Sequence, residues 1–385
     1  MEELSSVAGQ ATETAGQPPA ELNTTITRTH SMQVAGYMVA ASNGQVADIA
    51  AAITAFDAED LQSGYTTPIT QFPYGWAPSE VFYNVPALGD TQLNLSACAV
   101  AGILVGDIDK WNDPVLKRLN PEADLPDLDI TLVYLNLSMP ITLTLTQYLT
   151  DNCKAWKYGV LDNLGEVVAD VTNLMPSTDV EYNWRAVNAT EGAVCIGASM
   201  PVGKYVAQYP AAMQYAALEV ADGEFVEPTG ELNATAVAEL VKLAPAAGDA
   251  SAGWSAFNSI SSPGRYPVCY WGFATLASDL TAEGARGLYI RDVAGHLLTP
   301  EGQELVGTDS DEYPLPKPLM PAALDAWASI KTAASDVVTG IPVPVVAESA
   351  APAPTPAPAP GSGAAGMAAG APLLAAALAA VLMLA

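Results

Sequence analysis

The chain has 385 residues, 50% of them hydrophobic and 7% aromatic, which is enough for one large or two medium folded lobes. It carries 42 acidic and 14 basic residues, a formal net charge of −28. This charge argues against nucleic acids and anionic membrane surfaces as partners, because both would repel it, and it offers phosphate no general attraction.

The N-terminal segment, residues 1–23, is polar and acidic, and we predict that it is disordered. It has neither a basic start nor an apolar core, so it does not match a signal peptide. Residues 26–61 are rich in alanine. Residues 81–86, Val-Phe-Tyr-Asn-Val-Pro, form a β-branched and aromatic run closed by a turn, which predicts a strand.

Two helices are predicted in succession after this strand. Apolar residues recur at helical spacing from 97 to 104, which predicts a helix that runs into Gly106. Asp113 and Pro114 then predict a second helix start, because Asp accepts a backbone N–H as N-cap and Pro has no N–H to leave unsatisfied. Trp111 is interpreted as an apolar anchor packed under this turn, with a carbohydrate platform as the alternative.

The next stretch combines a strand with an ambiguous segment. Residues 130–134, Ile-Thr-Leu-Val-Tyr, predict a strand. Residues 140–149 alternate apolar and Thr residues, which taken alone indicates a strand. Apolar residues also recur every fourth position from Ile141 to Leu149, and Pro140 fits a helix start, so a helix is the prediction.

Six motifs in sequence order, over roughly residues 40–320, resemble the PstS-like phosphate-binding receptors of bacterial uptake systems. One of them runs Gly-Asp-Ile-Asp-Lys-Trp-Asn-Asp-Pro, from Gly106 to Pro114. The others include 81–86, 191–197, 215–218 with 223–229, 298–305 and 313–316, and residues 266–271 read as a core strand.

This resemblance implies an α/β, two-lobed fold of the periplasmic-binding-protein type. It implies a solute-binding domain at 24–335, with lobe 1 at about 24–92 and 200–335 and lobe 2 at about 93–199. It also places a strand at 47–53 and a helix at 140–149. The family opens with a strand and a Gly-rich Thr-Phe turn that supplies ligand contacts. Nothing before residue 24 resembles it, so the N-terminal strand–helix unit is expected to be missing.

The loop that grips the oxyanion in this family is replaced. The family loop is of the type Arg-Ser-Asp-Gly-Ser-Gly-Thr-Thr, whereas residues 135–142 read Leu-Asn-Leu-Ser-Met-Pro-Ile-Thr. The family's Arg falls on Leu135, and its buried Asp falls on or next to Ile53. The positions of its Ser-Gly-Thr donors are Met139, Pro140 and Ile141. The polar residues that remain, and that we predict as ligand-binding, are Asn136, Ser138 and Thr142.

These replacements predict weakened or altered binding of phosphate. Tight oxyanion capture needs a fixed cation and convergent donors, and Pro140 cannot donate an N–H. Two interpretations stay open. The cleft is re-purposed for a less charged ligand and lined by Leu135, Leu137 and Met139, or it is filled and binds nothing.

The reactive residues predict neither a metal site nor catalysis. The cysteines, which include no CxxC pair, are Cys98, Cys153, Cys195 and Cys269. They suit two disulfides in one of three pairings, or four buried thiols. His30 and His296 are the only histidines and stand in no motif, so we predict no enzyme, no catalytic residue, no metal and no cofactor. The acidic run 309–312 is interpreted as a solvated loop rather than a calcium site.

Both the glycosylation sequons and the C-terminus predict a secreted, anchored protein. Five predicted N-glycosylation sites are Asn23, Asn94, Asn136, Asn188 and Asn233. A sugar on Asn136 would stand where phosphate enters, unless that sequon is unused. Residues 336–366 predict a Pro/Ala-rich stalk. Residues 367–385 form an apolar tail that predicts a GPI signal with Ser362 as attachment site, the alternative being a low-complexity tail.

The predicted function is therefore that of a monomeric, GPI-anchored, PstS-like solute-binding protein on the outside of the plasma membrane. Its expected partners are phosphate or another small solute and, through the lipid anchor, the membrane, but no nucleic acid. The alternative is a structural or adhesive acidic surface glycoprotein that uses the fold as a scaffold.

Overall fold

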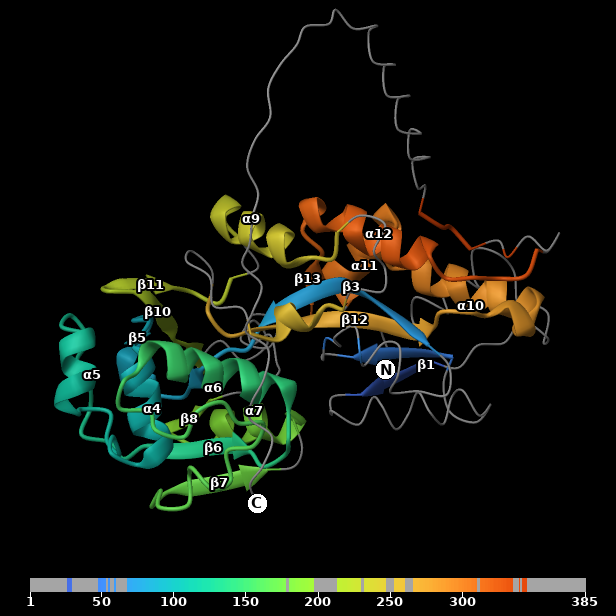
Figure 1. Cartoon of the computed structure of the whole chain (residues 1–385). Coiled ribbons are helices and arrows are strands. Elements are labelled where there is room, and N and C mark those ends of the chain that lie inside the picture. Colours follow the sequence, from blue (N-terminus) through green and yellow to red (C-terminus); the bar gives the residue numbers. More distant parts are fainter. Residues whose placement is uncertain are drawn as a thin grey trace, which may run out of the picture. The chain divides into compact units, whose positions relative to one another are not determined.

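The computed structural model (Figure 1) describes most of the segment between residues 68 and 334 and several shorter stretches before and after it. The described residues are 26–29, 48–52, 55, 59, 68–177, 180–196, 213–229, 232–246, 253–259, 266–309, 312–334, 339 and 341–344. All of them belong to one compact unit that spans residues 1–346. The predictions for residues 1–23 and for the tail 367–385 lie outside the described residues.

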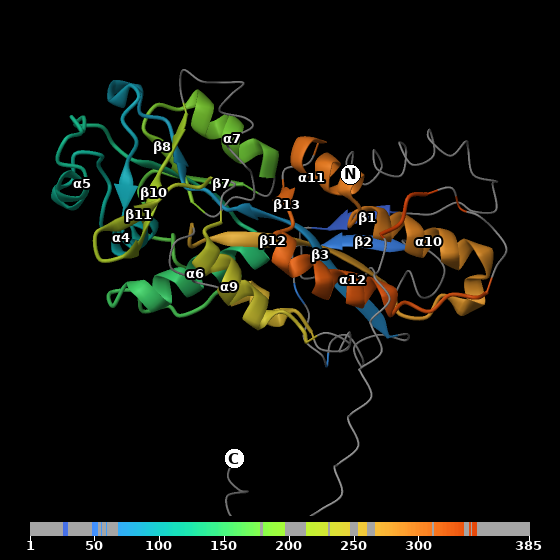
Figure 2. The ribbon, with the colours of Figure 1, turned by 90° about the horizontal axis from the view of Figure 1, so that it is seen from above.

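The first sheet has five strands in the order β1-β2-β12-β3-β13. They are β1 (Ile26–Thr29), β2 (Ile49–Ala52), β3 (Ile69–Pro78), β12 (Cys269–Ala277) and β13 (Tyr313–Pro314). Strand β12 lies between β2 and β3 and is antiparallel to both. Figure 2 shows these three strands from above. All of β3 and nearly all of β12 are buried, as expected for strands covered on both faces. The strand at 47–53 is confirmed, whereas β1 was not predicted from the sequence.

Two further sheets contain the remaining strands. A five-stranded sheet in the order β7-β6-β8-β4-β9 contains β4 (Phe82–Tyr83), β6 (Thr131–Leu135), β7 (Leu174–Ser177), β8 (Ala193–Cys195) and β9 (Gln214–Tyr215). A three-stranded sheet in the order β11-β10-β5 contains β5 (Asn94–Leu95), β10 (Ala217–Ala221) and β11 (Glu224–Val226). The predicted strand at 81–86 is shorter than expected, because a 3-10 turn, η2 (Pro86–Leu88), follows β4.

Helices cover these sheets. They are α4 (Ala97–Val105), α5 (Pro114–Leu119), α6 (Pro140–Asn152), α7 (Val180–Ala189), α9 (Ala234–Leu243), α10 (Ala285–His296), α11 (Pro300–Asp309) and α12 (Met320–Ala328). Short 3-10 helices are η3 (Ser255–Ser259), η4 (Thr281–Glu283) and η5 (Lys317–Leu319). Helices α11 and α12 pack on β3, α7 packs on β6 and β8, and α6 packs on α4 and β12. No helix in the described ranges combines the length and apolar character needed to cross a membrane.

The predicted helix signals at residues 97–119 are confirmed. Gly106 ends α4 with a left-handed φ of 80°, a conformation that glycine adopts without steric cost. Asp113 is the N-cap of α5 and accepts the backbone N–H of Val115 at 2.6 Å. Trp111 is fully buried and its indole N–H donates to the backbone oxygen of Gly192 at 3.0 Å. It is therefore an anchor, and the carbohydrate-platform alternative is wrong.

The ambiguous segment 140–149 is helical, as predicted, and forms most of α6. Its threonines explain why alternation suggested a strand. Thr142, Thr144 and Thr146 are all buried, so the helix is covered nearly all round. Thr146 satisfies its hydroxyl by donating to the backbone oxygens of Thr142 and Leu161, at 2.8 and 2.9 Å.

The cysteines form one disulfide, so the pairing is neither of the two sequence alternatives. Cys98 of α4 is joined to Cys153, the residue after α6, across 55 residues of sequence. Closing a loop of this length stabilises a fold by about 2–4 kcal/mol. Cys195 and Cys269 are buried and form no disulfide, and burial raises the pKa of Cys195 far above its ordinary value.

Glu312 corrects the interpretation of the acidic run 309–312 as a solvated loop. Its side chain is buried, and its carboxylate accepts a hydrogen bond from the Tyr74 hydroxyl at 3.3 Å. Two glycines make room for this pair. A Cβ on Gly272 would lie 2.8 Å from the Tyr74 ring and 2.9 Å from Glu312 Oε1, and a Cβ on Gly75 would lie 3.1 Å from Glu312 Cβ.

Candidate functional site

The candidate site lies at the carboxyl edge of the parallel strands β6, β7 and β8. Leu135, the last residue of β6, is paired with Ser177, the last residue of β7, and β8 runs parallel to β6 on its other side. In open α/β sheets this edge is where ligands bind. Residues 136–139 connect β6 to α6 there, at the position of the predicted ligand loop.

Three loop residues face inward and meet the first sheet. They form an apolar group, here called the loop cluster, whose members are Ala77, Leu135, Met139, Ile141 and Tyr270. Ala77 of β3 and Tyr270 of β12 are cross-strand partners in the first sheet. None of the five is more than 4% exposed. Each large apolar side chain buried in this way contributes about 1.5–3 kcal/mol. The loop cluster therefore joins the two five-stranded sheets without a charged group.

The three residues predicted as ligand-binding differ in their exposure to solvent. Asn136 and Ser138 are exposed, whereas Thr142 is buried within the first turn of α6. The Asn136 side chain lies close to Gly165, where an added Cβ would stand 3.0 Å from Asn136 Oδ1. Their role in binding stays a prediction, because only a bound solute would test it.

Backbone N–H groups that an anion would need are already used. Asn136 N–H donates to the backbone oxygen of Ser177 at 2.7 Å, and Met139 N–H donates to that of Asp162 at 2.8 Å. Pro140 has no N–H, and Thr142 N–H donates to the Met139 oxygen at 3.0 Å. A helix N-terminus attracts anions through such groups when they are free. Here the start of α6 presents few of them.

A buried acidic group stands where the chain crosses from β3 to β4. The Glu80 side chain is fully buried. Its neighbour Val81 donates its backbone N–H to the Tyr266 hydroxyl oxygen at 3.1 Å. Burial raises the pKa of Tyr266 well above its ordinary value, and the nearby Glu80 charge raises it further. The same two causes raise the pKa of Tyr313. These phenols are therefore neutral hydrogen-bonding groups near pH 7 and neither bases nor oxyanions.

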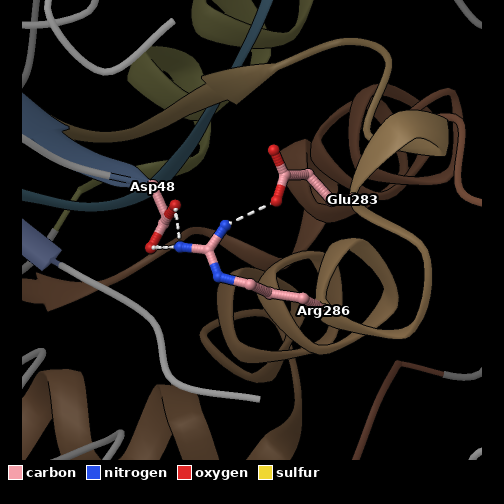
Figure 3. Close-up of polar contacts among 3 residues, drawn as sticks. All are labelled: Asp48, Glu283 and Arg286. Atoms are coloured by element: carbon pink, nitrogen blue, oxygen red, sulfur yellow. Dashed lines mark hydrogen bonds and ion pairs between the residues drawn. The ribbon is translucent and has the colours of Figure 1, made fainter. Parts of the chain in front are cut away.

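A second polar group, distant in sequence from the loop, surrounds Arg286 of α10 (Figure 3). Its guanidinium donates to both carboxylate oxygens of Asp48, at 2.6 and 2.7 Å, and to Glu283 at 2.7 Å. Asp48 directly precedes β2, so this pair fastens the start of that strand to α10. Two carboxylates therefore already neutralise the charge of the guanidinium. The described residues hold no cluster of metal ligands.

Comparison with known proteins decides the family. A model described as the PBP superfamily domain matches residues 5–271, more than half of the chain. This chain belongs to the PBP superfamily. Its relatives include PstS proteins, which confirms the resemblance predicted from the sequence. The phosphate-binding protein PstS of Methanocaldococcus jannaschii is 33% identical over 186 residues, 46% of this chain and 44% of that protein. PstS of Xylella fastidiosa (strain 9a5c) is 27% identical over 205 residues, 52% and 54% of the two.

The PBP chain therefore spans about half the length of the curated relatives it matches. Solved structures confirm the fold. A high-affinity periplasmic phosphate-binding protein (PfluDING) bound with phosphate has a TM-score of 0.58, 16% identity and coverage of 82% of this chain and 91% of that one. The phosphate-binding protein of Stenotrophomonas maltophilia also gives 0.58, with 15% identity over 78% and 92% of the chains.

Sequence reasoning missed the residues of the first sheet that contact the predicted ligand loop, residues 135–142. Tyr270 was recognised as part of a core strand, but its partners across the loop were not. Residues 270 and 271 point to opposite faces of β12, and only strand pairing tells which faces the loop. The signal that could have found Tyr270 is its position in the same apolar run as Trp271 and Cys269.

Proposed function

We propose that this chain is a PstS-type solute-binding protein in which an apolar contact replaces the oxyanion grip, so that inorganic phosphate binds weakly or not at all. One observation carries the proposal. Leu135, Met139 and Ile141 are buried against Tyr270 at the positions that the family resemblance assigns to oxyanion donors. Losing one charge-assisted donor from a buried site costs about 2–5 kcal/mol. Losing several removes micromolar affinity, since each 1.4 kcal/mol is about tenfold.

The competing proposal is a scaffold: an acidic surface glycoprotein with adhesive rather than solute-binding activity. The loop cluster favours it as well, because side chains that fill the site leave no polar lining for a solute. Neither proposal includes catalysis, in keeping with the binding proteins that the chain resembles.

Thermal unfolding with added solutes separates these proposals. For a protein that binds phosphate with micromolar affinity, 1 mM phosphate adds about 4 kcal/mol of stability. We expect no shift of the unfolding midpoint with phosphate, measured beside a PstS protein as positive control. A shift with a polyol, sulfate or nucleotide would support a re-purposed site. No shift with any solute would support the scaffold, and a shift with micromolar phosphate would overturn the proposed loss of the grip.

We further propose that the protein stands on the outer cell surface, with Ser362 as the site of its lipid anchor and Asn136 as a glycosylated residue. Exposure of Asn136 on the loop supports the second part. Phosphatidylinositol-specific phospholipase is expected to release the protein from intact cells, and Ser362→Leu to prevent its anchoring. Retention of the wild-type protein after treatment would contradict the anchor.

A further inference from the structure

The last described residues of the chain lie against α10. The Thr339 hydroxyl donates to Asp292 Oδ2 at 2.7 Å. His296 Nδ1 lies 3.1 Å from the backbone oxygen of Pro342. A carbonyl oxygen can only accept, so His296 carries a proton on Nδ1 and donates it. Two polar residues one helical turn apart on α10 thus hold two points of the terminal segment.

Two buried residues in this segment are three positions apart. Ile341 and Pro344 are buried, whereas Pro342 and Val343 between them are exposed. Ile341 belongs to the main apolar core. Three residues per turn is the period of an extended polyproline helix, and each proline restricts its own φ. One edge of the segment therefore packs on the domain and the other faces water.

Asp292 depends on this segment for one of its contacts. Its side chain is buried, with Oδ1 receiving a hydrogen bond from Arg291 at 3.1 Å and Oδ2 receiving that of Thr339. Leaving a buried carboxylate oxygen without a hydrogen-bond donor lowers the stability of the folded protein. The helix itself is held in place, because the Trp327 indole N–H donates to the Arg291 backbone oxygen at 2.9 Å and the ring packs on Gly295.

We propose that Thr339 and residues 341–344 form a strap that fastens the start of the proline-rich segment to α10. These residues are a structural part of the folded domain rather than the beginning of a free stalk. The strap fixes the point on the domain from which the chain continues, and a pull on the C-terminal segment is resisted at α10. This inference is independent of whether the domain binds a solute.

Paired substitutions within the strap test this in the full-length protein. Ile341→Ala removes a buried side chain, and Val343→Ala, two residues away, removes one that is 40% exposed. We expect Ile341→Ala to speed amide hydrogen exchange in α10 at least tenfold and to lower the unfolding midpoint, while Val343→Ala changes neither. Thr339→Val provides a milder variant that removes only the hydrogen bond to Asp292. We expect it to speed exchange in α10 by a smaller factor.

Two results would overturn the strap. One is exchange in α10 that stays at the wild-type rate in both Ile341→Ala and Thr339→Val. The other is equal effects of Ile341→Ala and Val343→Ala, which would show that the segment does not rest on the domain through one face.

Discussion

Replacement of Tyr270 by alanine is expected to lower the free energy of unfolding by about 3–5 kcal/mol, the range measured for large aromatic residues in protein cores. Tyr270 is 4% exposed and fills the space between β12 and the loop residues Leu135, Met139 and Ile141. The variant loses the transfer energy of the ring and leaves a cavity where two sheets meet. Urea unfolding followed by circular dichroism measures the change.

Tyr270→Phe is the matched control, because it keeps the ring and removes only the hydroxyl. We expect it to lose no more than about 1.5 kcal/mol, the net value of one hydrogen bond. Equal losses in the two variants would place the stabilisation in the hydroxyl group and contradict the apolar contact. We also expect no gain of phosphate binding in Tyr270→Ala, since the enlarged space still lacks a cation.

Replacement of Trp111 by alanine is expected to cost about 3–5 kcal/mol as well, for a different reason. The indole is fully buried, lies 5.5 Å from the Tyr83 ring and donates to the Gly192 backbone oxygen. Gly192 adopts φ 83°, and a Cβ there would stand 2.5 Å from the Asp129 backbone oxygen. Trp111 therefore supports a turn in which only glycine fits at position 192. Unfolding in urea measures the contribution of Trp111 to stability.

Trp111→Phe separates ring packing from the hydrogen bond. The Gly192 oxygen also accepts the Thr131 N–H at 3.1 Å, so it keeps one donor when the indole N–H is lost. We expect the phenylalanine variant to lose about 1–2 kcal/mol, less than the alanine variant loses. A Trp111→Ala protein as stable as the wild type would contradict the anchor.

Local signals predicted much of the fold because they act over a few residues. The cap at Asp113, the glycine at Gly106 and the buried Trp111 follow from short-range rules, and each is found where expected. Helix α6 was harder, since its buried threonines give a two-residue alternation in a helix that is covered nearly all round. The family resemblance, together with the Pro140 start and the four-residue apolar spacing, gave the correct prediction of a helix.

Contacts between distant segments could not be predicted in this way. The cysteine sequence allows three pairings, and only the approach of α4 to the end of α6 selects Cys98 with Cys153. Glu312 was interpreted as solvated because its neighbours are acidic, whereas two glycines from β3 and β12 make the space that buries it. The inward side of the loop likewise depends on Tyr270, which is 129 residues away from Ile141 (270 − 141).

The position of Tyr270 in β12 bears on how the protein responds to solutes. The strand that carries it is the central one of its sheet, hydrogen-bonded to β2 and β3 on its two sides. A ligand shifts a protein between two conformations only when it binds one of them better than the other. On the proposed function the loop cluster, and not a solute, joins the two five-stranded sheets. The protein would then keep the same conformation whether or not a solute is present.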